Sequence, residues 1–254
     1  MNRKNIVVVA FTAVVFALGA LIFHIPDAAI AESVPQGYTA ADIQVGGLLY
    51  DKWFKVLDVE VSGNHPLYPS EAKKSGGDTW RCKECHGWDS IGKDGRYKKG
   101  SHFTGIDGLY SARTKSPQQL YDALTDKGSA HTINALASNS DSVWALVKFI
   151  REGQIDISSA LNSDGTARGD AVNGGNLYSK ACAACHGKDG NKRDFDKGKE
   201  GIQGVGWLAN DNPQETLHKI RWGHPGSKMP SAVADKGMSD AETIDILTFS
   251  LTLK

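Results

Sequence analysis

The chain has no excess charge of either sign. Its 254 residues contain 29 lysines and arginines and 29 aspartates and glutamates. Without residues 1–31, 27 basic and 28 acidic side chains remain. Nucleic-acid binding requires a basic surface, so this balance gives no support for that class of function. No low-complexity tract or block of like charge stands out either.

Methionine and cysteine are both scarce. The chain has three methionines, and none of them lies between residues 32 and 228. It has four cysteines, and all of them belong to two copies of one pentapeptide, at residues 82–86 and 182–186. No cysteine is left over for any other purpose.

The pentapeptide is Cys-x-x-Cys-His, which is typical of covalent haem c attachment. The two thiols add to the haem vinyl groups, and the adjoining histidine binds iron through a ring nitrogen. A lone Cys-x-x-Cys also fits half a zinc site or a redox dithiol, but two complete copies disfavour both. The sequence therefore predicts two haems c, with iron ligands His86 and His186 and attachment through Cys82, Cys85, Cys182 and Cys185.

Residues 1–31 have the layout of a secretory signal peptide. Arg3 and Lys4 precede an apolar run at residues 6–23, and Ala29-Ile30-Ala31 offers a cleavage site. The run is also at the lower limit of a membrane span, so a retained anchor through residues 6–23 is the alternative. Whether this segment is a cleaved signal peptide or a retained anchor, its positively charged N-terminal end stays in the cytoplasm. We therefore expect the rest of the chain on the exported, periplasmic side of a bacterial inner membrane.

The chain resembles itself at two different shifts. At a shift of 100 residues the two pentapeptides coincide, and so do the apolar stripes at 144–149 and 244–249. Each stripe follows a Ser-Asp pair, which predicts the start of a helix. At a shift of 128, Gly46-Gly47-Leu48-Leu49-Tyr50 matches Gly174-Gly175-Asn176-Leu177-Tyr178. The first half thus has 28 extra residues before its pentapeptide.

This repeat predicts two domains, at residues 32–155 and 174–254. A linker rich in Ser, Asn, Asp and Gly joins them at residues 156–173. The 28 extra residues fall at about 56–79, where glycine and proline predict turns and no helix. This insertion is either a plain surface loop or a loop that covers a haem edge or docks a partner.

These features resemble class I cytochrome c domains in tandem. In that family an N-terminal helix with small and aromatic residues crosses a C-terminal helix, and the haem motif follows the first helix. Gly174, Gly175 and Tyr178 match the first helix, and Phe249 lies on the second. The resemblance covers residues 42–254 apart from the insertion and linker. It implies a mainly α fold with two haem-binding domains.

The resemblance also implies a sixth iron ligand for the second haem. The distal methionine of the family usually precedes a proline, and Met229-Pro230 follows His186 by 43 residues. The other candidates are Met238, His224 and His218. A thioether favours ferrous iron, so the haem with Met229 should have the higher potential.

The first domain has no methionine for this position. Its segment Gly128-Ser129-Ala130-His131 aligns with Gly226-Ser227-Lys228-Met229, which places His131 45 residues after His86. His131 is the expected ligand, His102 its main rival and His65 a weaker one. Two imidazoles support ferric iron better than a thioether does, so the first haem should have the lower potential.

Two saturated irons favour an electron relay over catalysis. We expect the electron donor to be a dehydrogenase or membrane complex and the acceptor to be a cytochrome or terminal oxidase. We expect no nucleic-acid partner. The same relay chemistry is compatible with a cytochrome subunit of a larger membrane complex. The alternative is a dihaem enzyme with the first haem as its active site. A thiosulfate dehydrogenase of the similar kind has an axial cysteine, and none is spare here. A peroxidase needs His131 or His102 to leave the iron on activation.

Overall fold

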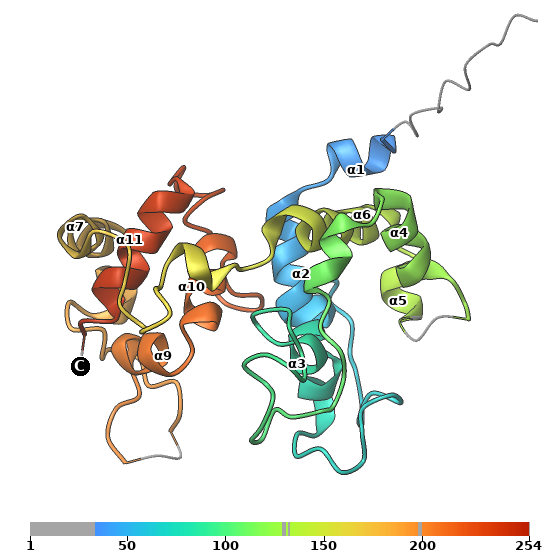
Figure 1. Ribbon diagram of the computed structural model, residues 1–254, viewed down its shortest axis with the longest axis horizontal. Coiled ribbons are helices and arrows are strands. Elements are labelled where there is room, and N and C mark those ends of the chain that lie inside the picture. Colours follow the sequence, from blue (N-terminus) through green and yellow to red (C-terminus); the bar gives the residue numbers. More distant parts are fainter. Residues whose placement is uncertain (1–33, 129–130, 132, 198–199, 254) are drawn as a thin grey trace, which may run out of the picture. The chain divides into compact units, whose positions relative to one another are not determined.

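The regular structure of the chain is helical. The computed structural model describes residues 34–128, 131, 133–197 and 200–253 (Figure 1). The α-helices of the first half are α1 (Gln36–Ala40), α2 (Ile43–Val56), α3 (Cys82–His86), α4 (Pro117–Thr125), α5 (Asn134–Ala137) and α6 (Ser140–Lys148). Those of the second half are α7 (Ala171–Ala181), α8 (Ala183–His186), α9 (Val205–Asp211), α10 (Pro213–Trp222) and α11 (Asp240–Ser250).

Short helical turns complete the backbone. They are the 3-10 turns η1 (Gly76–Trp80), η2 (Tyr110–Thr114) and η4 (Ile157–Ser159), and the π-turn η3 (Phe149–Gly153). In the described part of the chain the only strand-like pairings are two isolated bridges, Gly92–Asp107 and Leu161–Ala167. The expected mainly α fold is confirmed.

The main helices begin at side chains that cap them. Ser239 and Glu242 form a capping box at the start of α11, and Asn139 accepts a hydrogen bond from Ser142 N–H at the start of α6. These caps satisfy backbone N–H groups that have no partner in the first turn of a helix. The two helices predicted from the apolar stripes are therefore confirmed.

Two glycines allow close approach of α2 to α6 in the first half and of α7 to α11 in the second. A Cβ atom on Gly46 of α2 would lie 2.0 Å from the Ala145 carbonyl oxygen of α6. A Cβ atom on Gly174 of α7 would lie 1.9 Å from the Asp245 carbonyl oxygen of α11. In Figure 1, α7 accordingly lies beside α11. Only glycine, which has no Cβ atom, permits such close contact with a backbone carbonyl. Because both helices have glycine at this position, the two halves share the same helix crossing.

The apolar core consists of two clusters of buried side chains. The larger is built on α2 and α6 and includes Trp53, Leu146 and Phe149. The smaller is built on α7, α10 and α11 and includes Tyr178 and Leu247. Trp222, from the end of α10, packs into the larger cluster. Residues of the second half therefore complete the core of the first.

The irregular segments lie close to where the sequence places them. The insertion predicted at about 56–79 has no helix over residues 57–75, but α2 extends to Val56 and the turn η1 begins at Gly76. The start of α7 at Ala171 falls inside the predicted linker, because Asp170 accepts hydrogen bonds from Val172 and Asn173 N–H groups. Within residues 34–253, as far as they are described, no helix is long and apolar enough to cross a bilayer. The predicted signal peptide or anchor lies outside the described residues.

Candidate haem sites

The first pentapeptide forms a single helical turn that orients one imidazole. After α3 the chain reverses at Gly87, where φ is +78°, and Gly92 N–H donates to the His86 carbonyl at 2.9 Å. His86 Nδ1 lies 2.8 Å from the Asp107 carbonyl oxygen. A carbonyl only accepts, so Nδ1 carries the proton and Nε2 keeps its lone pair for a metal. This is the usual second-shell arrangement of a ligating histidine.

The second pentapeptide has the same backbone geometry. Gly187 has φ of +84°, and Lys192 N–H donates to the His186 carbonyl at 2.9 Å. His186 Nδ1 is buried and has no hydrogen-bond partner among the described residues. Its ring meets the edge of Phe195 at a centroid distance of 6.1 Å. In the described part of the chain, the second site therefore has no counterpart of the bond between His86 Nδ1 and the Asp107 carbonyl.

A tyrosine anchors each pentapeptide, from α2 in the first half and from α7 in the second. Tyr50 Oη donates to the Gly87 carbonyl at 2.6 Å, and Tyr178 Oη donates to the Gly187 carbonyl at 3.0 Å. The Tyr50 ring packs against Phe149 of η3, and the Tyr178 ring packs against Phe249 of α11. The sequence repeat includes both tyrosines but gave no indication of this hydrogen bond.

The thiols are in the state required for attachment to a haem. None of the four cysteines, all of which are described, forms a disulfide. Burial raises the pKa of Cys82 to about 12, and it raises the pKa values of Cys85 and Cys182 to about 11. These three free thiols are therefore protonated at neutral pH.

His131 lies opposite His86. The two ring centroids are 5.9 Å apart, with an angle of 30° between the ring planes. The two rings are stacked. Burial lowers the pKa of both histidines, and their mutual proximity lowers that of His86 further. Neutral imidazole is the form that binds a metal, so both histidines are in the form that an iron site requires.

The two rival histidines have other partners. His102 Nδ1 lies 2.8 Å from Glu84 Oε1, and its ring stacks on Tyr97 at 4.6 Å. His65 Nδ1 accepts a hydrogen bond from Leu67 N–H at 3.2 Å, and its ring packs against Trp80 at 4.8 Å. The ring of His131 lies near that of His86, while an Nδ1 contact such as that of His102 is also compatible with a ligating histidine.

The candidates for the second iron lie in different surroundings. Met229 is half-buried in the loop after α10, and Met238 packs against the smaller core cluster. His218 is fully buried, with Nε2 3.1 Å from the Gly47 carbonyl. His224 Nδ1 lies 3.1 Å from Asp51 Oδ2. Both of these histidines therefore bind groups of the first half, and Met229 stays the predicted ligand.

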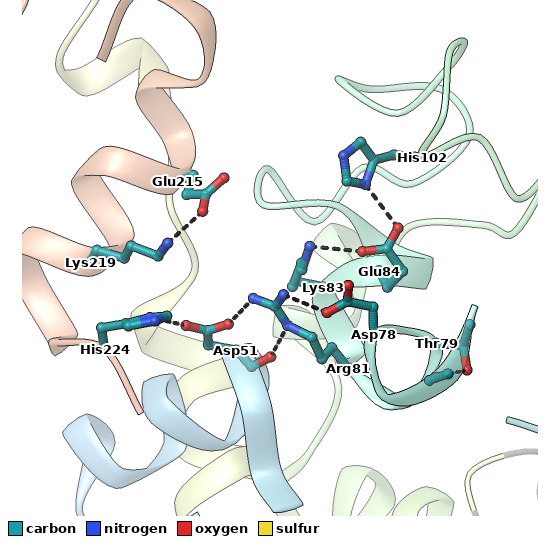
Figure 2. A network of polar contacts seen from close by, with 11 residues as sticks. Asp51, Asp78, Thr79, Arg81, Lys83, Glu84, His102, Glu215, Lys219 and His224 are labelled. Atoms are coloured by element: carbon teal, nitrogen blue, oxygen red, sulfur yellow. Dashed lines mark hydrogen bonds and ion pairs between the residues drawn. The ribbon is translucent and has the colours of Figure 1, made fainter. Parts of the chain in front are cut away.

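The variable residues of the first pentapeptide are buried charges (Figure 2). Lys83 Nζ lies 2.7 Å from Glu84 Oε2, and the other Glu84 oxygen faces His102. Burial raises the pKa of Glu84, but the contacts with His102 and Lys83 outweigh it and bring the pKa to about 2. The second pentapeptide has Ala183 and Ala184 at these positions. The two sites therefore differ in the charge held beside them.

A family match covers the second site. Residues 169–249 match the family described as Cytochrome C oxidase, cbb3-type, subunit III. The match supports a c-type cytochrome domain in this segment. It contains Cys182, Cys185 and His186, which implies covalently bound haem c, the cofactor of electron-transfer cytochromes. Residues 34–168 lie outside the match. No curated protein matches the chain.

Proposed function

We propose that the chain is an exported dihaem electron-transfer cytochrome with two tandem class I cytochrome c domains, at residues 32–155 and 174–254. One observation carries the proposal: the contacts around the matched cytochrome motif recur around the first motif. The Tyr50–Gly87 bond corresponds to Tyr178–Gly187 at the shifts of 128 and 100. The helix crossings at Gly46 and Gly174 correspond at the same shifts.

The residues of each domain have three tasks in this proposal. Cysteines hold the porphyrin, His86 and His186 bind iron from one side, and His131 and Met229 bind it from the other. When bound, haem c supplies an iron that changes between the ferrous and ferric states by one electron. With both axial positions filled, protein groups leave no place for a substrate on iron. The protein then controls electron transfer between the haems through the reduction potential of each, which its iron ligands, burial and hydrogen bonds would set.

The unlike ligands give the relay a direction. A thioether favours ferrous iron and a second imidazole favours ferric iron, so with both haems bound, electrons would pass from the His86/His131 site to the His186/Met229 site. The likeness of residues 169–249 to an oxidase subunit supports redox partners in a respiratory chain. We propose a dehydrogenase or membrane complex as donor and a cytochrome or oxidase as acceptor.

A potentiometric titration combined with carbon monoxide tests this function. The proposal predicts two one-electron steps, and no binding of carbon monoxide to either ferrous iron. A first haem that binds carbon monoxide in the unmutated protein would show an open iron. That outcome would replace the relay with a dihaem enzyme of the peroxidase-like or thiosulfate dehydrogenase-like kind.

A further inference from the structure

Asp51 of α2 is a fully buried carboxylate with partners on two sides (Figure 2). One oxygen pairs with the guanidinium of Arg81, and the other lies 3.1 Å from His224 Nδ1. Burial raises its pKa, but the bond from His224 and the charge of Arg81 outweigh burial and hold the pKa well below its usual range. A buried ionised carboxylate with two such partners is fixed in position.

On one side this carboxylate is bound to the first haem motif. Arg81 immediately precedes Cys82, and its carbonyl accepts a hydrogen bond from Glu84 N–H at 2.9 Å. Its Nε also donates to the Asp51 carbonyl at 2.9 Å, where α2 leaves helical geometry at Lys52. The position of Asp51 is therefore set by the rigid turn that begins the first motif.

On the other side the carboxylate is bound to the loop that carries Met229. His224 N–H donates to the Met229 carbonyl at 3.3 Å. Ser227 joins the two, because its hydroxyl donates to the His224 carbonyl at 2.8 Å and accepts from Met229 N–H at 3.1 Å. The three residues form one hydrogen-bonded turn, so a displacement of His224 is passed to the backbone of Met229.

The repeat does not reproduce the Asp51–His224 pair. At the shift of 128, Asp51 corresponds to the exposed Ser179. At the alignment that pairs His131 with Met229, His224 corresponds to Asp126. The contact is therefore no part of the fold of a single domain. It joins the first half of the chain to the ligand loop of the second.

We propose that Asp51 is a positioning residue for the second iron, since its carboxylate fixes His224 and thereby the turn that presents Met229. This inference rests on the proposed function, because it takes Met229 as an iron ligand. The ligation of one haem then depends on a carboxylate beside the attachment site of the other.

The test compares Asp51→Asn with Asp78→Asn in the full-length holoprotein. Asp78 pairs with the same Arg81 at 3.2 Å, but its side chain is 53 % exposed, so it is the matched control. The readouts are the weak red absorption band of methionine-bound ferric haem and the rate at which added imidazole binds ferric iron. We expect Asp51→Asn to lose most of the band and to bind imidazole at least tenfold faster. Asp78→Asn should stay within twofold of the unmutated protein.

His224→Ala breaks the same contact from the other side. The side chain is 30 % exposed, so this variant serves if Asp51→Asn does not fold. It should show the same loss of the band. A band and an imidazole rate like those of the unmutated protein in either folded variant would overturn the inference. If Met229→Ala keeps the band, Met229 is not the iron ligand and the proposed ligation is wrong. If Met229→Ala loses the band but Asp51→Asn and His224→Ala keep it, the ligation stands and only the role of Asp51 is refuted.

Discussion

At the scale of single residues, the proposed first iron site has two candidates for its second protein ligand. The ring of His131 lies 5.9 Å from that of His86, and His102 Nδ1 contacts Glu84. We predict that His131→Ala opens the first iron, so that the ferrous protein binds one carbon monoxide. His102→Ala is the matched control and should bind none. The opposite result, with His102→Ala open and His131→Ala closed, would make His102 the ligand.

His218 makes the stability of the protein depend on pH. Burial is the main cause that lowers its pKa, to about 4, so the unfolded chain takes up the proton more readily than the folded one. The folded state therefore loses stability as the pH falls from about 6.5 toward 4, by roughly 3 kcal/mol in total.

Urea unfolding at pH 7.5 and pH 4.5 measures this effect. His218→Gln keeps a donor for the Gly47 carbonyl, to which His218 Nε2 binds at 3.1 Å, but does not titrate. The loss of stability between the two pH values should be about 2 kcal/mol smaller in this variant. An equal loss in both proteins would show that His218 is not the source.

At the scale of helices, two adjacent glycines of α7 should differ in what they tolerate. A Cβ atom on Gly174 would meet the Asp245 carbonyl at 1.9 Å, but one on Gly175 would meet the Phe249 ring at 3.1 Å. Helix propensity favours alanine equally at both. The α11 backbone cannot move aside, whereas a side-chain ring can rotate. Gly174→Ala should therefore lower the free energy of unfolding by about 1–3 kcal/mol or more.

Gly175→Ala should change the free energy of unfolding by less than about 1 kcal/mol. Denaturant unfolding of the two variants checks the difference. Equal effects at both positions would mean that α7 and α11 do not cross at Gly174.

The helices were easier to predict from the sequence than the contacts between them. Ser-Asp starts and apolar spacing predicted α6 and α11, because capping and periodicity are local signals. α7 begins inside the predicted linker, where Asp170 caps it. Both helix crossings are implied by the resemblance to cytochrome c domains, and Gly46 and Gly174 lie at them.

At the scale of the whole molecule, the contacts that join its halves could not be predicted. Asp51 and His224 are separated by 173 residues, and neither has a counterpart in the repeat. Trp222 and His218 of α10 pack against the first half, although the sequence singled out His218 only as a candidate iron ligand. Such contacts depend on how two folded halves meet, for which a single sequence has no local signal.

The central claim is that one chain carries two covalent haems, and the intact mass of the denatured mature protein tests it most directly. We predict a mass of the polypeptide plus two haems. Replacement of Cys82 and Cys85 by serine should leave one haem, and so should replacement of Cys182 and Cys185. A single haem on the unmutated protein would contradict the account.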